Sequence, residues 1–187
     1  EYGLSFKTLS KEIMRKKIGD DIFYNIIREI CKLQNDLIKE NISLPVTGHF
    51  VQNRQSMINW CPIGRNASLD ERSKFKEFLK KNSNFRDWQI DILKERASLL
   101  GFADKITFKL GGDTSIDIYP KGWDKTYALR HFPDLTPWFV GDRCTGSGND
   151  REIYDLLKAK DAAFATTSPE RTAEIIDGVI IPVLRSN

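Results

Sequence analysis

Residues 106–120 read ITFKLGGDTSIDIYP, and this stretch decides the fold of the chain up to Pro120. Apolar and polar residues alternate on both sides of a Gly111-Gly112 turn, which predicts two antiparallel strands, Ile106–Leu110 and Ser115–Tyr119. Together with the elements predicted upstream, they give the order β–α–β–β–α–α–β–β. That order favours an antiparallel sheet that is covered on one face by helices.

The upstream elements are predicted from hydrophobic spacing and from capping residues. Apolar residues recur at helical spacing from Asp20, an expected N-cap, to a stop before Pro45. Ser68 and Glu71 form a capping-box pattern that begins a second helix, and a third helix covers roughly residues 86–100. Short strands are predicted around Leu4–Phe6, Ile13–Arg15, Gly48–Gln52 and Met57–Cys61.

After Pro120 the pattern of elements changes. Pro137–Val140 and Ala162–Thr166 are short apolar strands with a helix between them, and Ser168 caps a last helix. Strand–helix–strand–helix is typical of a parallel sheet in an α/β protein. We therefore place a domain boundary near residue 120 and assign the chain to the α/β class.

The composition excludes several classes of function. The 187 residues include 29 basic and 26 acidic side chains, a net charge of +3, and they form no basic stripe of the kind that nucleic-acid-binding proteins carry. The longest apolar runs are too short to span a membrane. Cys31, Cys61 and Cys144 are too widely spaced to indicate a disulfide framework or a zinc site. We expect a cytoplasmic protein.

Asp142 and Asp150 form the first candidate site. Asp142 directly follows the apolar strand Phe139–Val140, at the edge where α/β folds place their ligand crevice, and a Gly-Ser-Gly loop leads to Asp150. Two such carboxylates suit a hard cation such as Mg²⁺, which prefers oxygen ligands. In the alternative interpretation, Asp142 caps a loop and Asp150 is a helix N-cap.

Lys125 is a second candidate, because it lies at the beginning of a predicted helix. A cation there is unfavourable beside the helix dipole, so the position favours a nearby anion. An ordinary surface lysine is the alternative.

Arginines and strand residues upstream form a third candidate site. Arg54, Arg65 and Arg72 carry guanidinium groups that bind phosphate oxygens well if they converge. Ser115 and Asp117 share the polar face of their strand, where they suit hydroxyl groups of a ligand. A solvated sheet face is the alternative for these two.

Three runs of residues resemble those of eukaryotic-type phosphomannomutases. RQSMINWCPIGRN at residues 54–66 is similar to their R-N-G-M-L-N-V-S-P-I-G-R-N segment. GGDTSIDIYPKGWDK at residues 111–125 is similar to G-G-Q-I-S-F-D-V-F-P-x-G-W-D-K. Gly141-Asp142 with Gly148-Asn149-Asp150 resembles their F-G-D-K and G-G-N-D pair. The resemblance extends over nearly the whole chain in the same order.

The resemblance implies a fold. That family belongs to the haloacid-dehalogenase superfamily, in which an α/β cap is inserted into a Rossmann-like core with a parallel sheet. Residues 1–18 would be a core hairpin that leads into the cap. Residues 19–120 would be the substrate-binding cap, an α+β unit with an antiparallel sheet, and residues 121–187 the C-terminal part of the core.

The resemblance also implies an activity, the interconversion of mannose-6-phosphate and mannose-1-phosphate through an aspartyl-phosphate. Mg²⁺ would be the cofactor, a hexose-1,6-bisphosphate the activator, and the cap the interface of a homodimer. Lys125 would neutralise the transferred phosphoryl group, Asp142 would bind Mg²⁺, and Asp150 would support that metal site. The cap residues that would hold the distal phosphate and the hydroxyl groups are Arg54, Arg65, Arg72, Ser115 and Asp117.

Several residues depart from the family pattern. Asp113 replaces a glutamine and adds a negative charge near the expected phosphate, and Arg143 replaces a lysine. The catalytic aspartates of the family lie in a D-x-D-G-T motif, whereas this sequence contains no Asp-x-Asp. We therefore expect the chain to be a fragment that is inactive alone. The alternatives are a sugar-phosphate phosphatase with the same cap and a non-catalytic sugar-phosphate-binding remnant.

Overall fold

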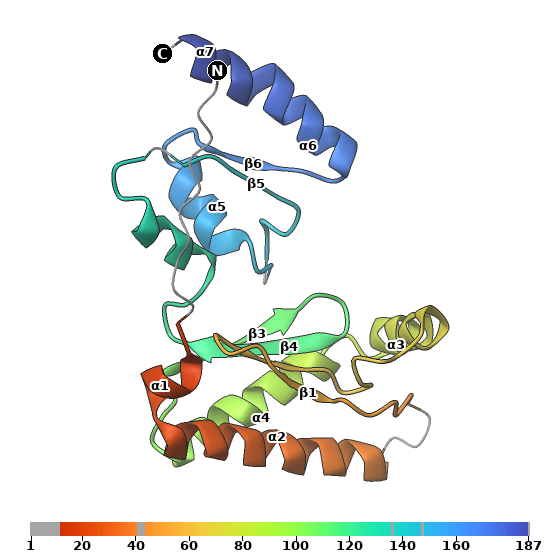
Figure 1. Ribbon diagram of the computed structural model, residues 1–187. Coiled ribbons are helices and arrows are strands. Elements are labelled where there is room, and N and C mark those ends of the chain that lie inside the picture. Colours follow the sequence, from red (N-terminus) through yellow and green to blue (C-terminus); the bar gives the residue numbers. More distant parts are fainter. Residues whose placement is uncertain (1–11, 41–43, 136, 147, 187) are drawn as a thin grey trace. The chain divides into compact units, whose positions relative to one another are not determined.

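The computed structural model describes residues 12–40, 44–135, 137–146 and 148–186 (Figure 1). The chain divides into two compact units, one up to Pro120 and one from Lys121 onward. The first contains a four-stranded antiparallel sheet and the second a two-stranded parallel sheet, so the chain is of the predicted α/β class. Within the described ranges, no helix is long and apolar enough to cross a membrane.

The sheet of the first unit has the strand order β1-β2-β4-β3, with every pair antiparallel. The strands are β1 (Val51–Asn53), β2 (Ile58–Trp60), β3 (Ile106–Gly111) and β4 (Ser115–Pro120). All four were predicted from the sequence. The hairpin of β3 and β4 closes through the Gly111-Gly112 turn, so the polar residues of β4 lie beside those of β2.

Two helices, α2 (Asp20–Glu40) and α4 (Phe85–Leu99), pack against one face of this sheet (Figure 1). Their buried side chains recur every three or four residues, as an apolar helix stripe requires. The indole N–H of Trp60 donates to Gln34 Oε1 of α2 at 2.8 Å, so this fully buried ring has a partner for its polar atom. Other buried side chains of these elements are Ile26, Ile30, Leu33, Ile58, Ile90, Leu93, Ile116 and Ile118.

The helix α3 (Leu69–Lys81) begins at the predicted capping box. The Ser68 hydroxyl accepts from the backbone N–H of Glu71, and the Glu71 carboxylate accepts from the Ser68 N–H at 2.7 Å. Such a cap contributes about 1 kcal/mol to helix stability. Phe75 packs in a small core with Ile63, which attaches α3 to the loop that follows β2.

Residues 14–18 correct the prediction of a strand around Ile13–Arg15, because they form the helix α1 (Met14–Ile18). The Gly19 N–H donates to the Arg15 carbonyl at 3.0 Å, one helical turn back. Met, Arg and Lys favour helices, but five residues are too few to show a helical period in the sequence. The strand predicted around Leu4–Phe6 lies outside the described residues.

Asp20 is also placed differently from the prediction. It is the first residue of α2 rather than its N-cap, and its carboxylate accepts two hydrogen bonds from the Arg15 guanidinium at 2.7 and 2.8 Å. An anion in the first turn is favoured by the helix dipole, so this position still helps α2 to begin.

The second unit is built on the parallel strands β5 (Phe139–Gly141) and β6 (Ala163–Ala165), which are connected through α5 (Arg151–Lys158). The sequence predicted these three elements. Ser168 caps the following helix as predicted, with its hydroxyl accepting from the Arg171 N–H at 3.2 Å. The remaining elements are the 3₁₀ helix η1 (Lys125–His131), α6 (Pro169–Ile175), the π-helical turn η2 (Ile176–Ile180) and α7 (Ile181–Ser186).

Candidate functional site

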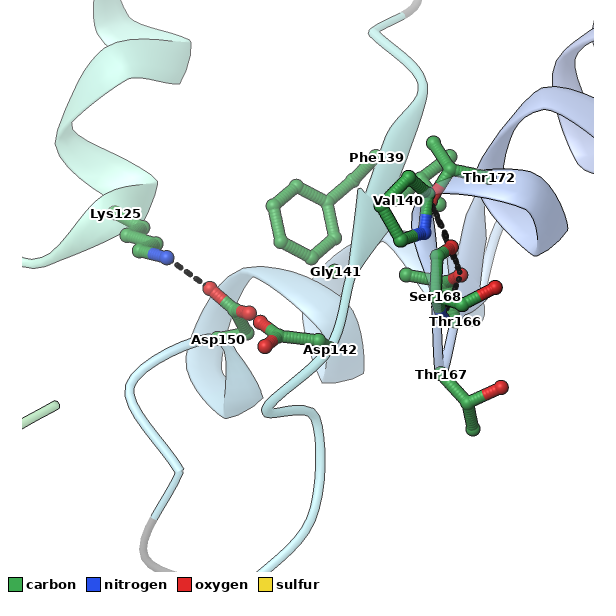
Figure 2. Close-up of a pocket in the computed structure, with 11 residues that line it drawn as sticks. Lys125, Phe139, Val140, Gly141, Asp142, Asp150, Thr166, Thr167, Ser168 and Thr172 are labelled. Carbon is green, nitrogen blue, oxygen red and sulfur yellow. Dashed lines mark hydrogen bonds and ion pairs between the residues drawn. The ribbon is translucent and has the colours of Figure 1, made fainter. Parts of the chain in front are cut away.

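The second unit has a cavity of about 410 Å³ at the carboxyl ends of its two parallel strands. Lys125, Asp142 and Asp150 line one side, and hydroxyl side chains that follow β6 line the other (Figure 2). In open α/β sheets, ligands bind outside the carboxyl ends of the strands. The structure therefore brings Lys125 together with Asp142 and Asp150, two candidate sites that the sequence predicted separately.

Lys125 and Asp150 form the ion pair of this cavity (Figure 2). The Lys125 ammonium contacts Asp150 Oδ1, and the backbone N–H of Arg143 donates to Asp150 Oδ2 at 3.1 Å. The Asp150 side chain is only 3% exposed, whereas that of Lys125 is 46% exposed. The buried aspartate therefore fixes the position of the lysine, whose side chain remains partly exposed and lines the cavity.

Asp150 carries a negative charge at neutral pH. Burial raises its pKa, but the hydrogen bonds from Lys125 and from the Arg143 N–H outweigh burial, so its pKa lies below the ordinary value. Asp150 occupies the N-cap position of α5, yet its side chain makes no capping hydrogen bond. It supplies instead the anion that Lys125 needs at the beginning of η1.

Asp142 directly follows β5 and lines the cavity with an exposed carboxylate. In the parts of the chain that the structure describes, no group of three or more His, Cys, Asp or Glu side chains is suited to a metal ion. Mg²⁺ often takes only one or two protein carboxylates and completes its shell with waters and substrate phosphates. The exposed Asp142 fits that requirement, whereas both oxygens of Asp150 are already engaged.

The hydroxyl side chains after β6 line the cavity, and sequence reasoning missed them. Thr166 donates to the Ser168 carbonyl at 2.9 Å, and Thr172 Oγ1 lies 3.0 Å from that same carbonyl oxygen. Thr167 stands apart from these hydrogen bonds (Figure 2). The signal in the sequence is a run of three hydroxyl residues, Thr166-Thr167-Ser168, at the end of a strand.

In the first unit, a tight loop after β2 carries Arg65. A Cβ at Gly64, where φ is +91°, would lie 2.2 Å from the Gly48 carbonyl oxygen, so only glycine fits this turn. The Gly64 N–H donates to the Cys61 carbonyl at 2.9 Å, and the Arg65 N–H donates to the His49 carbonyl at 3.2 Å. The backbone that carries Arg65 is therefore fixed from both sides.

Arg72 reaches from the first turn of α3 to the same loop. Its guanidinium donates to the carbonyls of Ala67 and Arg65, each at 2.9 Å, and to Thr114 Oγ1 at 3.3 Å. The sequence predicted Arg72 as a phosphate ligand. The structure shows that three of the five guanidinium donors already serve the protein, and that they connect α3, the Arg65 loop and the turn before β4.

Ser115 and Asp117 share the face of β4 that is opposite to the buried Ile116 and Ile118. Ser115 is only 3% exposed, whereas Asp117 is partly exposed. Both residues accept from the side-chain amide of Asn59 on β2, with Nδ2 2.9 Å from Ser115 Oγ and 2.6 Å from Asp117 Oδ1. Sequence reasoning missed Asn59.

Arg54 of the predicted site and Asp113, which departs from the family pattern, have their own partners. Arg54 directly follows β1, and its Nε donates to Gln52 Oε1 at 2.9 Å. Asp113, in the turn between β3 and β4, forms an ion pair with Lys76 Nζ at 2.7 Å. The negative charge that was expected to oppose a phosphate is therefore compensated by a lysine of α3.

Each unit carries part of the predicted site residues. Arg54, Arg65, Arg72, Ser115 and Asp117 belong to the first unit, and a lysine with two carboxylates lines the cavity of the second. Guanidinium forks match phosphate oxygens, and a positioned lysine stabilises charge on a phosphoryl group. Such a fold with such sites is typical of α/β proteins that act on phosphorylated ligands.

Comparison with known proteins specifies this class further. The family model described as eukaryotic phosphomannomutase matches residues 1–182, so the chain belongs to the eukaryotic phosphomannomutase family. The resemblance seen in the sequence is thereby confirmed.

Several curated proteins named phosphomannomutase are similar to this chain. That of Encephalitozoon cuniculi is 39% identical over 164 residues, which are 83% of this chain and 60% of the relative. That of Dendrobium officinale is 38% identical over 136 residues, which are 72% of this chain and 51% of the relative. That of Arabidopsis thaliana is 35% identical over 168 residues, which are 89% of this chain and 63% of the relative. The chain thus spans between 51% and 63% of the length of these three relatives.

Proposed function

We propose that this chain provides the sugar-phosphate site and part of the phosphoryl-transfer site of a phosphomannomutase of the haloacid-dehalogenase type. The reaction is the interconversion of mannose-6-phosphate and mannose-1-phosphate through an aspartyl-phosphate. The observation that carries the proposal is the cavity in which the Lys125–Asp150 pair meets Asp142 at the ends of β5 and β6. Membership of the phosphomannomutase family supports the same activity.

Lys125 is the proposed catalytic residue of this chain. Its ammonium is partly exposed to the cavity and is held by the buried Asp150, so it is oriented before a substrate enters. A cation fixed in this way stabilises the charge on the oxygens of a phosphoryl group in transit. Asp150 is then a positioning residue, because it acts through Lys125.

Asp142 is proposed to bind Mg²⁺, with the rest of the coordination shell coming from water and from the substrate phosphate. A bound Mg²⁺ would supply a second positive charge for the same phosphoryl oxygens. Asp150 supports this site indirectly, since its own oxygens accept from Lys125 and Arg143.

The first unit is proposed to bind the distal phosphate and the hydroxyl groups of a hexose phosphate. Arg54, Arg65 and Arg72 would hold the distal phosphate, and Ser115 with Asp117 would hold the sugar hydroxyls. Among the arginines, Arg72 has the double task of bracing the loop and contacting the ligand. We also propose a hexose-1,6-bisphosphate activator, a homodimer through the cap and a cytoplasmic location.

The phosphoryl acceptor is proposed to be an aspartate that these 187 residues do not supply, because their sequence contains no Asp-x-Asp. Cys144 does not replace it. Burial, together with the charges of Asp150 and Asp142, raises the pKa of the Cys144 thiol, so the thiol stays protonated at neutral pH.

Binding of mannose-1-phosphate tests the proposed sugar-phosphate site. We expect saturable binding by the chain in isothermal titration calorimetry, and Arg65→Ala should weaken it by about tenfold to a hundredfold, since a charge-assisted hydrogen bond contributes about 1.5–3 kcal/mol. Lys80→Ala is the control, because it removes one positive charge from an exposed position of α3. The control should bind within about twofold of the unmodified chain. Equal affinities of Arg65→Ala and the unmodified chain would contradict the assignment.

Turnover separates the mutase from the two alternatives. With Mg²⁺, mannose-1-phosphate and glucose-1,6-bisphosphate, we expect the chain alone to form neither mannose-6-phosphate nor inorganic phosphate. Isomerisation by the chain alone would refute the proposal that the acceptor lies outside it. Release of inorganic phosphate without the bisphosphate would favour the phosphatase. Binding without turnover, even when a segment with D-x-D-G-T from a relative is supplied, would favour a non-catalytic binding module.

A further inference from the structure

Asn59 lies at the centre of the hydroxyl-binding face of the first unit. It belongs to β2, is 2% exposed and is the cross-strand partner of Asp117 on β4. Its amide nitrogen donates to Asp117 Oδ1 at 2.6 Å and to Ser115 Oγ at 2.9 Å. We name Asn59, Ser115 and Asp117 the acceptor cluster.

The orientation of the Asn59 amide follows from its partners. The Ser115 hydroxyl donates its proton to the Gly111 carbonyl at 2.5 Å, so Ser115 Oγ can only accept from Asn59. The Asp117 carboxylate likewise needs a donor. The amide nitrogen must therefore face both residues, and each of its two hydrogens is used. Every side-chain donor of the cluster is thus committed inside the protein, and lone pairs are what remain for a ligand.

The amide oxygen of Asn59 is buried and finds no hydrogen-bond partner among the residues that the structure describes. A buried polar atom without a partner destabilises the folded state. The two hydrogen bonds that the amide donates offset this cost, and both go to side chains of the proposed sugar site.

Gly111 confines the Asp117 carboxylate from the other side. A Cβ at Gly111 would lie 2.7 Å from the carboxyl carbon of Asp117, so the carboxylate lies directly against the glycine backbone. The Asn59 amide fixes one carboxylate oxygen, and the contact with Gly111 limits the movement of the whole group. The acceptor is therefore oriented before a ligand binds.

We propose that Asn59 is a positioning residue for sugar recognition, and that it leaves the acceptor cluster with only hydrogen-bond acceptors to offer a ligand. The inference rests on the proposed function and deepens it. Hydroxyl groups of a sugar are bound here as donors. A phosphate, which carries negative charge and accepts hydrogen bonds, is disfavoured as a direct partner of the acceptor cluster. The acceptor cluster thereby sets which end of a hexose phosphate binds at which part of the first unit.

Two ligands separate sugar recognition from phosphate binding. Mannose-6-phosphate offers hydroxyl donors and a phosphate, whereas methyl phosphate offers the phosphate alone. In Asn59→Leu, which has a similar size and no donor, we expect mannose-6-phosphate to bind about tenfold more weakly and methyl phosphate to bind within about twofold of the unmodified chain. NMR titration of the chain with each ligand gives both affinities.

Gln89→Leu is the matched control. Gln89 is also fully buried in the first unit, and neither its amide nitrogen nor its amide oxygen has a partner among the described residues. We expect this variant to bind both ligands as the unmodified chain does. Asn59→Ser, which is smaller and keeps one donor, is expected to lose less than Asn59→Leu and serves if that variant does not fold.

The outcomes distinguish this inference from the proposed function. Equal weakening of both ligands, or no weakening of either, in the Asn59 variants would overturn the positioning role while leaving the proposed function intact. If the unmodified chain binds methyl phosphate and mannose-6-phosphate equally, the acceptor cluster recognises no sugar, and the inference falls alone. If it binds neither ligand, the proposed function falls and the inference with it.

Discussion

Asp150→Ala is expected to lower the free energy of unfolding of the second unit by about 3 kcal/mol. The Asp150 side chain is 3% exposed and accepts from both Lys125 and the Arg143 N–H, so its removal leaves an ammonium and an amide without their acceptor. A hydrogen bond to a charged group contributes about 1.5–3 kcal/mol, and solvent around the half-exposed Lys125 recovers part of the loss. Urea-induced unfolding, followed by tryptophan fluorescence, measures the change.

Asp142→Ala is the control for that measurement. It removes the same charge from the same cavity, but its carboxylate is exposed, so we expect a change within about 0.5 kcal/mol. If the two variants lose equal stability, the difference in burial between Asp142 and Asp150 does not determine their roles.

The same ion pair predicts how the stability of the second unit depends on pH. Because the pKa of Asp150 is lower in the folded chain than in the unfolded one, the carboxylate stabilises the fold above the unfolded pKa. This contribution is lost as the pH falls below about 4 and through the folded pKa. Asp150→Asn should therefore be less stable than the unmodified chain at pH 7 and should lose less stability on acidification.

Arg72→Ala is expected to lower the free energy of unfolding of the first unit by about 2 kcal/mol and also to weaken the binding of mannose-1-phosphate. The substitution leaves the carbonyls of Ala67 and Arg65 and the Thr114 hydroxyl without their donor. Arg54→Ala is the control, since its side chain donates a hydrogen bond to Gln52 within one hairpin, and we expect a stability change within about 0.5 kcal/mol.

Arg72→Lys shows whether the planar fork of the guanidinium matters. A lysine ammonium retains the charge but cannot span the three acceptors. We therefore expect Arg72→Lys to recover less than half of the stability that Arg72→Ala loses. Full recovery would mean that charge alone, rather than the bracing of the Arg65 loop, explains the position.

Much of the fold was predictable, because its main elements are defined by local patterns. The alternation in residues 106–120 predicted the hairpin of β3 and β4, and the capping box at Ser68 predicted where α3 begins. α1 was not predictable, since five residues show no period. Trp88 of α4 is 50% exposed, and a single large apolar residue in the sequence does not reveal which face of a helix is buried.

The candidate site was predictable only where its residues follow from position in the chain. A carboxylate after an apolar strand indicated the edge of the parallel sheet, and Asp142 does line the cavity there. The pairing of Lys125 with Asp150 bridges 25 residues, and that of Asn59 with Asp117 bridges 58. Contacts of this kind depend on how separate elements pack, which no local spacing encodes. For the same reason, the bracing role of Arg72 was not visible in the sequence.

The loop that carries Arg65 is ordered by the protein's own hydrogen bonds, from the turn at Gly64 to the guanidinium of Arg72. The conformational entropy of this loop is therefore lost when the chain folds and not when a ligand associates. A ligand meets a preorganised surface, so association should proceed without a slow rearrangement of this loop. Variants of Arg65 should then differ from the unmodified chain mainly in the dissociation rate of the ligand.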